Sequence, residues 1–175
     1  IGSCWAIGFA PDGSVVAAGD KVDPATRAMS WVVLRSATGD AGAWQILDTF
    51  QTAEWTGLSA RGCLATRSGL IYVSGWAYNS KTMKNHWIVR ASPDGGVNWS
   101  VSDDFNYGGT TMQVSEMAED AAGNIFTCGQ AADRYGKLFW IVRKGSWTTN
   151  PAQGKPVFSF GWSTSDTFHL APDKP

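Results

Sequence analysis

Aromatic and charged side chains suited to binding a sugar or a peptide lie between the regular strand-like stretches of the chain. Aromatic rings offer flat apolar faces, and a few carboxylates and guanidinium groups supply directed hydrogen bonds. The candidate binding residues are Trp55, Trp76, Tyr78, Tyr107 and Tyr135, together with Glu54, Arg61 and Arg134. The alternative is that these side chains only cap the edges of sheets and are partly exposed.

Other kinds of chemistry have little support. Cys4, Cys63 and Cys128 form no Cys-x-x-Cys pair and no cluster with histidine, so we expect no metal and no cofactor. We expect small buried thiols rather than a disulfide, and the odd number leaves one thiol unpaired unless another chain supplies its partner. A formal net charge of −1 provides no basic surface for nucleic acid. No apolar stretch approaches the roughly 20 residues that a membrane helix needs.

Three repeated units position the candidate residues. The units align without gaps on Gly13, Gly69 and Gly123, which gives a repeat of about 55 residues. After each of these glycines comes a short apolar or β-branched stretch that closes on a second glycine, as β-strands do before a turn. These stretches are residues 14–19, 70–75 and 124–129.

Each unit continues with two more strand-like stretches. The first opens with tryptophan and ends on arginine, at residues 31–35, 87–90 and 140–143. The second has tryptophan six residues before phenylalanine and aspartate two before it, at residues 44–50, 99–105 and 162–168. We expect the arginines to pair with these aspartates. The arginines are Arg35, Arg90 and Arg143, and the aspartates are Asp48, Asp103 and Asp166.

Tandem units of four antiparallel strands predict an all-β fold made of β-propeller blades, three in this chain. The predicted blades are residues 1–53, 54–108 and 109–175, the last with an insertion at about 146–157 and a C-terminal tail. The smallest closed propellers have about four blades. We therefore expect an open arc, or a ring completed by further blades of a longer chain or by a second subunit. The insertion and the tail are an alternative cap for the last blade.

One segment carries a family resemblance. Residues 92–99, Ser-Pro-Asp-Gly-Gly-Val-Asn-Trp, resemble the Asp-box S-x-D-x-G-x-T-W of bacterial neuraminidase repeats, with asparagine where threonine is usual. The chain also resembles the repetitive propeller modules of large exported proteins of environmental bacteria. The resemblance implies a folding element made by Ser92, Asp94, Gly96 and Trp99 in the hairpin between strands three and four. It further implies an extracellular, periplasmic or cell-surface location, with ligand sites on the opposite face.

The resemblance does not carry sialidase chemistry with it. That chemistry needs three arginines around a carboxylate, a Tyr–Glu pair and an acidic aspartate, and no arginine here lies in the expected Arg-Ile-Pro setting. We expect a non-catalytic binding or scaffold module that recognises glycan or protein. The alternatives are an exo-glycosidase with a propeller catalytic domain and a structural subunit of a larger assembly.

Overall fold

The computed structural model describes residues 2–150 and 157–169 and confirms the predicted fold class. The described residues form three four-stranded antiparallel sheets and no helix. The first sheet contains β1 (Gly2–Phe9), β2 (Val15–Val22), β3 (Met29–Ser36) and β4 (Trp44–Phe50). The second contains β5 (Trp55–Ala65), β6 (Ile71–Asn79), β7 (Lys84–Ser92) and β8 (Ser100–Phe105). The third contains β9 (Met112–Glu119), β10 (Ile125–Ala132), β11 (Leu138–Asn150) and β12 (Val157–Phe168).

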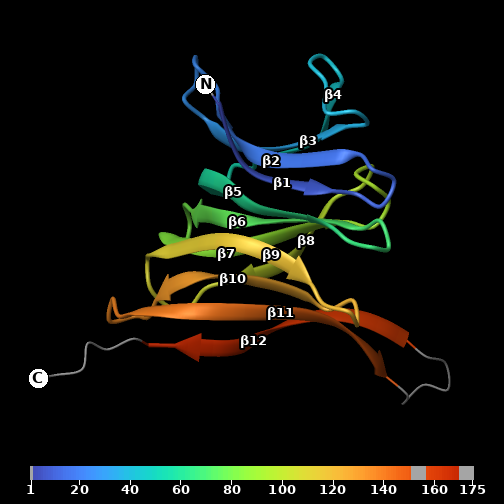
Figure 1. Cartoon of the computed structure of the whole chain (residues 1–175). Helices are drawn as coiled ribbons and strands as arrows, with labels where there is room; N and C mark the ends of the chain where they lie inside the picture. Colours follow the sequence, from blue (N-terminus) through green and yellow to red (C-terminus); the bar gives the residue numbers. More distant parts are fainter. Residues whose placement is uncertain (1, 151–156, 170–175) are drawn as a thin grey trace, which may run out of the picture.

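The three sheets stack on one another in chain order, as the blades of a propeller do (Figure 1). Each sheet keeps its strands in sequence order, so the first strand forms one edge and the fourth forms the other. The first strands β1, β5 and β9 contact one another in succession. These three strands therefore form a common inner edge of the arc.

The aligned glycines that define the repeat form identical turns between the first and second strands of each sheet. Gly13, Gly69 and Gly123 have φ angles of 82°, 86° and 81°, a conformation that residues with a Cβ rarely adopt. In each turn the backbone N–H of the glycine donates to the carbonyl three residues earlier. The gapless alignment therefore follows from one turn geometry used three times.

The second repeated glycine has a different cause, which is a β-bulge in the neighbouring first strand. Each sheet carries one extra first-strand residue opposite this glycine. A Cβ on Gly19, Gly75 or Gly129 would lie only 2.0–2.1 Å from the carbonyl oxygen of the bulged strand. Glycine is therefore required because the bulge brings backbone against backbone.

Two apolar cores fill the spaces between the sheets. The core between the first and second sheets includes Trp31, Leu58 and Ile88, and the core between the second and third includes Trp87 and Ile125. All five of these side chains are at most 1% exposed. The prediction that the third-strand tryptophans lie between blades is thus confirmed at both junctions.

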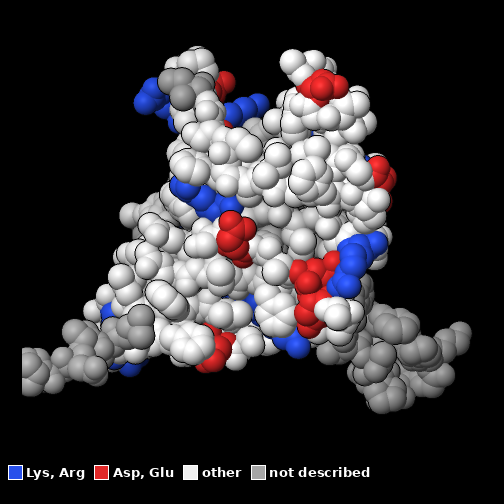
Figure 2. Space-filling view, viewed as in Figure 1, with Lys and Arg blue, Asp and Glu red and all other residues white. Residues whose placement is uncertain are grey.

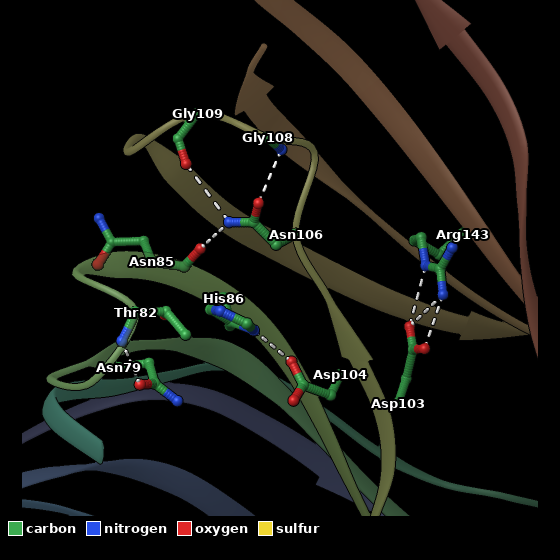
Figure 3. A network of polar contacts seen from close by, with 10 residues as sticks. All are labelled: Asn79, Thr82, Asn85, His86, Asp103, Asp104, Asn106, Gly108, Gly109 and Arg143. Atoms are coloured by element: carbon green, nitrogen blue, oxygen red, sulfur yellow. Dashed lines mark hydrogen bonds and ion pairs between the residues drawn. The ribbon is translucent and has the colours of Figure 1, made fainter. Parts of the chain in front are cut away.

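An arginine–aspartate pair closes each junction. The Arg90 Nε atom donates to an Asp48 carboxylate oxygen at 2.8 Å, and Arg143 makes the same bond with Asp103 at 2.9 Å (Figure 3). In both pairs the arginine belongs to the later sheet and the aspartate to the earlier one. Each guanidinium also lies over the phenylalanine of that earlier sheet, 4.3 Å from the Phe50 ring centre in the first junction.

Arg35 does not belong to this series, so its predicted pairing with an aspartate of the fourth strand is wrong. The first unit has one more residue between its tryptophan and its arginine than the other two. Leu34 consequently holds the place of Arg90 in the strand register, and Arg35 lies on the opposite face. There it binds Asp12 and Ser14 of its own sheet and donates to the carbonyl oxygen of Gly95 at 3.0 Å.

The segment that resembles an Asp-box forms a tight hydrogen-bonded turn between β7 and β8. The Asp94 carboxylate accepts bonds from the Ser92 hydroxyl and from the backbone N–H groups of Val97 and Asn98. The Ser92 hydroxyl oxygen accepts the N–H of Gly96, and the Trp99 indole N–H donates to the Gly96 carbonyl. Polar groups of this turn are thereby satisfied locally, which is what a folding element requires.

The cysteines agree only in part with the expectation of buried thiols. Cys63 is buried, and burial raises its pKa to about 12. Cys4 and Cys128 are exposed, so the expectation is wrong for these two, because they lie on the sheets at the two ends of the stack. All three are free thiols.

The predicted insertion and tail coincide with the least described part of the chain. Residues 146–150 continue β11 and pair with β12, so this part of the predicted insertion is strand. Residues 151–156 and the tail at 171–175 lie outside the described residues. In the described part, no helix is long and apolar enough to span a membrane.

Replacing Gly75 by alanine should destabilise the fold by about 1–3 kcal/mol, the usual cost of overpacking. The added Cβ would lie 2.1 Å from the Ser59 carbonyl oxygen and 2.7 Å from the Trp31 ring, so it would strain both the bulge and the core. Urea unfolding measures the loss. Gly161→Ala is the matched control, because that strand glycine has open space around its Cβ position. Equal stability of the two variants would contradict the packing argument.

Acid should weaken the fold through its turn carboxylates. The backbone N–H and the side-chain amide of Asn98 lower the pKa of Asp94 from 3.8 to about 2. Because the folded-state pKa is the lower one, the contribution of this carboxylate is complete above the ordinary value and is lost as the pH falls toward 2. The difference in Tm between the native chain and Asp94→Asn should therefore shrink between about pH 5 and about pH 2. A constant difference would show that the charge of Asp94 plays no part.

Candidate functional site

The three bulges place one side chain each on the inner edge of the arc. The extra residues are Trp5 in β1, Arg61 in β5 and Ser115 in β9. A bulge turns its extra residue away from the regular alternation of the strand, which is why bulges often lie next to binding sites. The repeat therefore presents three different side chains from one repeated backbone feature.

These three residues line a cavity of about 560 Å³, which we call the bulge cavity. This volume is within the range of about 300–1,000 Å³ that is usual for small-ligand sites. The other lining residues come from the second and third sheets. They are Trp76, Asn85, Thr111, Met112, Gln113, Val114 and Glu116.

Trp5 is held in place from two sides. Its indole Nε1 donates to an Asp20 carboxylate oxygen at 2.7 Å, and the Ser59 hydroxyl donates to the same oxygen at 2.7 Å. The Arg61 guanidinium lies 3.7 Å from the centre of the Trp5 ring, within the range of a cation–π contact. Nearly half of Trp5 is still exposed, at 49%. The ring is thus fixed in orientation and remains open to solvent.

The polar groups around the cavity provide both donors and acceptors. Arg61 supplies a guanidinium, Glu116 a carboxylate, and Asn85 and Gln113 supply amides. The Gln113 side-chain oxygen accepts a bond from the Gln130 amide at 2.8 Å, which orients it. Figure 2 shows basic and acidic groups meeting over β5 and β9 on an otherwise mostly uncharged face.

Two of the eight predicted binding residues, Trp76 and Arg61, line the bulge cavity. Three others lie on the second sheet toward the loop that joins β6 to β7. Glu54 forms an ion pair with Lys81 of that loop, and Tyr78 donates to the sulfur of Met83. Trp55 packs edge-on against the ring of His86, which is itself 2.5 Å from the Asp104 carboxylate (Figure 3).

Of the remaining three predicted residues, Tyr107 lies where the second and third sheets meet, and Arg134 and Tyr135 lie in the β10–β11 turn. Tyr107 packs between the rings of Phe105 and Phe139, so it is a structural contact of this junction. Arg134 lies over the ring of Tyr135, which is 78% exposed at the β10–β11 turn. The structure therefore separates the predicted set into two cavity residues, three residues near the β6–β7 loop, one residue between the sheets and two residues of the β10–β11 turn.

Sequence reasoning missed Trp5, Asp20, Gln113 and Ser115. The sequence does contain a sign of Trp5 and Ser115, because the second glycine of each repeat lies opposite a bulge. Reading that glycine as a bulge signal would have pointed to Trp5, Arg61 and Ser115 together. Asp20 and Gln113 carry no such mark, since their roles depend on contacts between neighbouring strands.

The described residues contain no group of histidine, cysteine, aspartate and glutamate side chains that could hold a metal ion. The side chains of the bulge cavity offer stacking on Trp5 or Trp76 and hydrogen bonding to charged and amide groups. Aromatic faces with surrounding polar groups suit a small polar ligand with an apolar side, as sugars have.

Comparisons with solved structures reveal similar folds at low sequence identity. An α-L-arabinofuranosidase from Fusarium graminearum matches with a TM-score of 0.60 at 13% identity, over 79% of this chain and 44% of the enzyme. A fucose lectin from Kordia zhangzhouensis, solved with methyl-fucoside, matches with a TM-score of 0.56 at 14% identity, over 91% of this chain and 96% of the lectin. An α-L-arabinanase from Penicillium chrysogenum, solved with arabinobiose, gives a TM-score of 0.52 at 14% identity, over 91% of this chain and 61% of the enzyme.

These matches show a propeller-type fold and nothing more specific. The chain spans less than two thirds of the length of either enzyme but almost the whole of the lectin. No protein-family model matches the sequence, and a search of curated proteins found no match.

Proposed function

We propose that the chain is a carbohydrate-binding arc of Asp-box-type propeller blades, with the bulge cavity as its site. The main support for the proposal is the Trp5 ring, which is fixed in orientation, half-exposed and in contact with Arg61 in the bulge cavity. A sugar can stack its apolar face on such a ring while its hydroxyl groups bond to the guanidinium, carboxylate and amides. The lectin of matching length gives this proposal additional support, because its structure holds methyl-fucoside.

The Asp-box assignment rests on the turn itself. Ser92, Asp94, Gly96 and Trp99 make the local hydrogen bonds of a folding element, and Gly96 has a φ of 109° with Leu47 of the first sheet pressed against it. We assign the chain on this basis, and on its resemblance to modules of large exported proteins, to an exported or cell-surface bacterial protein. A protein ligand is a weaker fit, because the cavity is concave and small-molecule sized.

Trp5→Ala should weaken sugar binding by about tenfold or more, which corresponds to about 1.4 kcal/mol. The change removes the stacking surface and leaves the Asp20 carboxylate with Ser59 alone among its described side-chain partners. Calorimetric titration of the full chain with methyl-fucoside and with arabinobiose measures the effect, and a panel of other monosaccharides extends the search.

Arg61→Ala should also weaken binding, and Tyr135→Ala is the matched control because that exposed ring lies outside the cavity. Binding that survives the loss of Trp5 and Arg61 but not the loss of Tyr135 would move the site to the β10–β11 turn. If no sugar in the panel binds the native chain, the proposal is wrong.

A glycosidase is the second candidate, because two of the matched structures are an α-L-arabinofuranosidase and an α-L-arabinanase by name. Hydrolysis of a glycosidic bond normally needs two carboxylates on either side of the bond. Among the described residues that line the cavity, Glu116 is the carboxylate, and Asp20 is engaged by Trp5 and Ser59. The geometry thus favours binding over hydrolysis.

The chain should accordingly release no nitrophenol from 4-nitrophenyl α-L-arabinofuranoside above the uncatalysed rate. The absorbance of free nitrophenolate measures this directly. Glu116→Gln serves as the companion variant. If the native chain hydrolyses the substrate and this variant does not, the chain is a glycosidase rather than a carbohydrate-binding module.

A further inference from the structure

The two junctions between sheets share one set of contacts. In each, a tryptophan and a phenylalanine of the earlier sheet are paired across its third and fourth strands, and both are nearly buried in the first junction, at 0% for Trp31 and 7% for Phe50. The later sheet contributes an arginine that covers this phenylalanine and binds the aspartate two residues before it. We call the tryptophan, phenylalanine and aspartate of the earlier sheet the receiving half of the junction. The next sheet supplies the arginine.

The third sheet carries a complete receiving half, and none of the sheets in the described part of the chain packs against it. Trp140 pairs with Phe168 in the same register, but these side chains are 61% and 48% exposed. Asp166 lies opposite Val142, as Asp103 lies opposite Val89 in the sheet before. We call this surface the C-terminal face.

Asp166 is the charged group of that face. Among the described residues its bond is to the backbone N–H of its neighbour Thr167, at 2.7 Å, and no described arginine reaches it. Its counterparts Asp48 and Asp103 each bind an arginine of the next sheet within 3 Å. The C-terminal face is therefore an aromatic surface with an open carboxylate at the position where an arginine is bound elsewhere.

The opposite end of the stack does not supply this arginine. The outward row of the first sheet is Ile7, Ala17, Leu34 and Ile46, which are paired with one another across its four strands. Leu34 holds the arginine place, and Arg35 is turned toward the second sheet, where it reaches the Gly95 carbonyl. A second copy docked head to tail would thus cover Asp166 with a leucine and leave a carboxylate without its partner, which is costly.

We propose that the C-terminal face docks a further blade of the same repeat, one whose third strand ends in arginine as the second and third sheets do. That guanidinium would lie over Phe168 and bind Asp166 through two bonds, as Arg143 binds Asp103. Charge complementarity selects this partner over a second copy of the chain, whose first sheet is apolar at the decisive position. The partner is the next blade of the repeat in a longer chain, because in both described junctions the arginine comes from the sheet that follows in chain order.

The proposal can be tested by giving the chain the missing arginine. Leu34→Arg places a guanidinium on the outward row of the first sheet, in the register of Arg90 and directly after an equivalent bulge. The variant chain then carries both halves of the junction. Sedimentation velocity over a range of concentrations should show head-to-tail association at least about tenfold tighter than that of the native chain.

Two further variants identify the contact. The double variant Leu34→Arg, Asp166→Asn should lose the gain, because the guanidinium then has no carboxylate to bind. Leu34→Lys should recover only part of it, since an ammonium group lacks the planar fork that binds two oxygens and stacks on a ring. Unchanged circular dichroism and Tm establish that all variants are folded.

Either of two results would overturn the proposal. Native chains that already associate as tightly as Leu34→Arg would show that a second copy covers the face without arginine. A folded Leu34→Arg variant with no gain in association would show that Asp166 and Phe168 do not form a receiving half. Both results are independent of sugar binding, which is measured at the bulge cavity.

Discussion

The structure depends on one contact between successive sheets: an arginine of one sheet that spans a phenylalanine and a carboxylate of the sheet before it. A four-stranded sheet of this kind has two apolar faces and cannot bury either alone. Trp31 and Trp87 are fully buried at the two junctions, but an apolar face by itself does not fix how far one sheet slides over the next. Arg90 and Arg143 fix this offset, because a guanidinium that must both bind two oxygens and cover a ring has few acceptable positions. The offset in turn brings the first strands together at the inner edge.

At the inner edge, the residues that pack the sheets separate from the residues that line the bulge cavity. The repeated glycine at positions 19, 75 and 129 allows a bulge in each first strand, and the bulge releases one residue from the packing that holds the rest of the strand. That residue can vary without cost to the core. Trp5, Arg61 and Ser115 are accordingly unlike one another, although the turns, tryptophans and glycines around them repeat closely.

The sequence was sufficient to predict the fold and largely insufficient to predict the site. Turn glycines, third-strand tryptophans and the fourth-strand aspartates recur at fixed spacings, because each is needed by a local geometry that is used three times. The face on which a residue lies is harder to predict, since one additional residue reverses it. Arg35 shows this: its place at the end of the third strand suggested a pair with a fourth-strand aspartate, and the additional residue Leu34 turned it to the other face of the sheet. Tyr107 illustrates another difficulty, because its packing between the rings of Phe105 and Phe139 depends on the third sheet.

The bulge cavity is asymmetric because each first strand contributes a different side chain to it. A ring of identical blades would present the same side chain from each first strand, and its sites would be equivalent. Here the three inner strands present an indole, a guanidinium and a hydroxyl to one cavity, and Asp20 and Ser59 tie the indole to the neighbouring sheet. The orientation of the indole is therefore coupled to the packing of the first sheet on the second, because Asp20 and Ser59 come from different sheets. The repeat supplies the rigid frame, and the few positions that the frame leaves free determine what the cavity can bind.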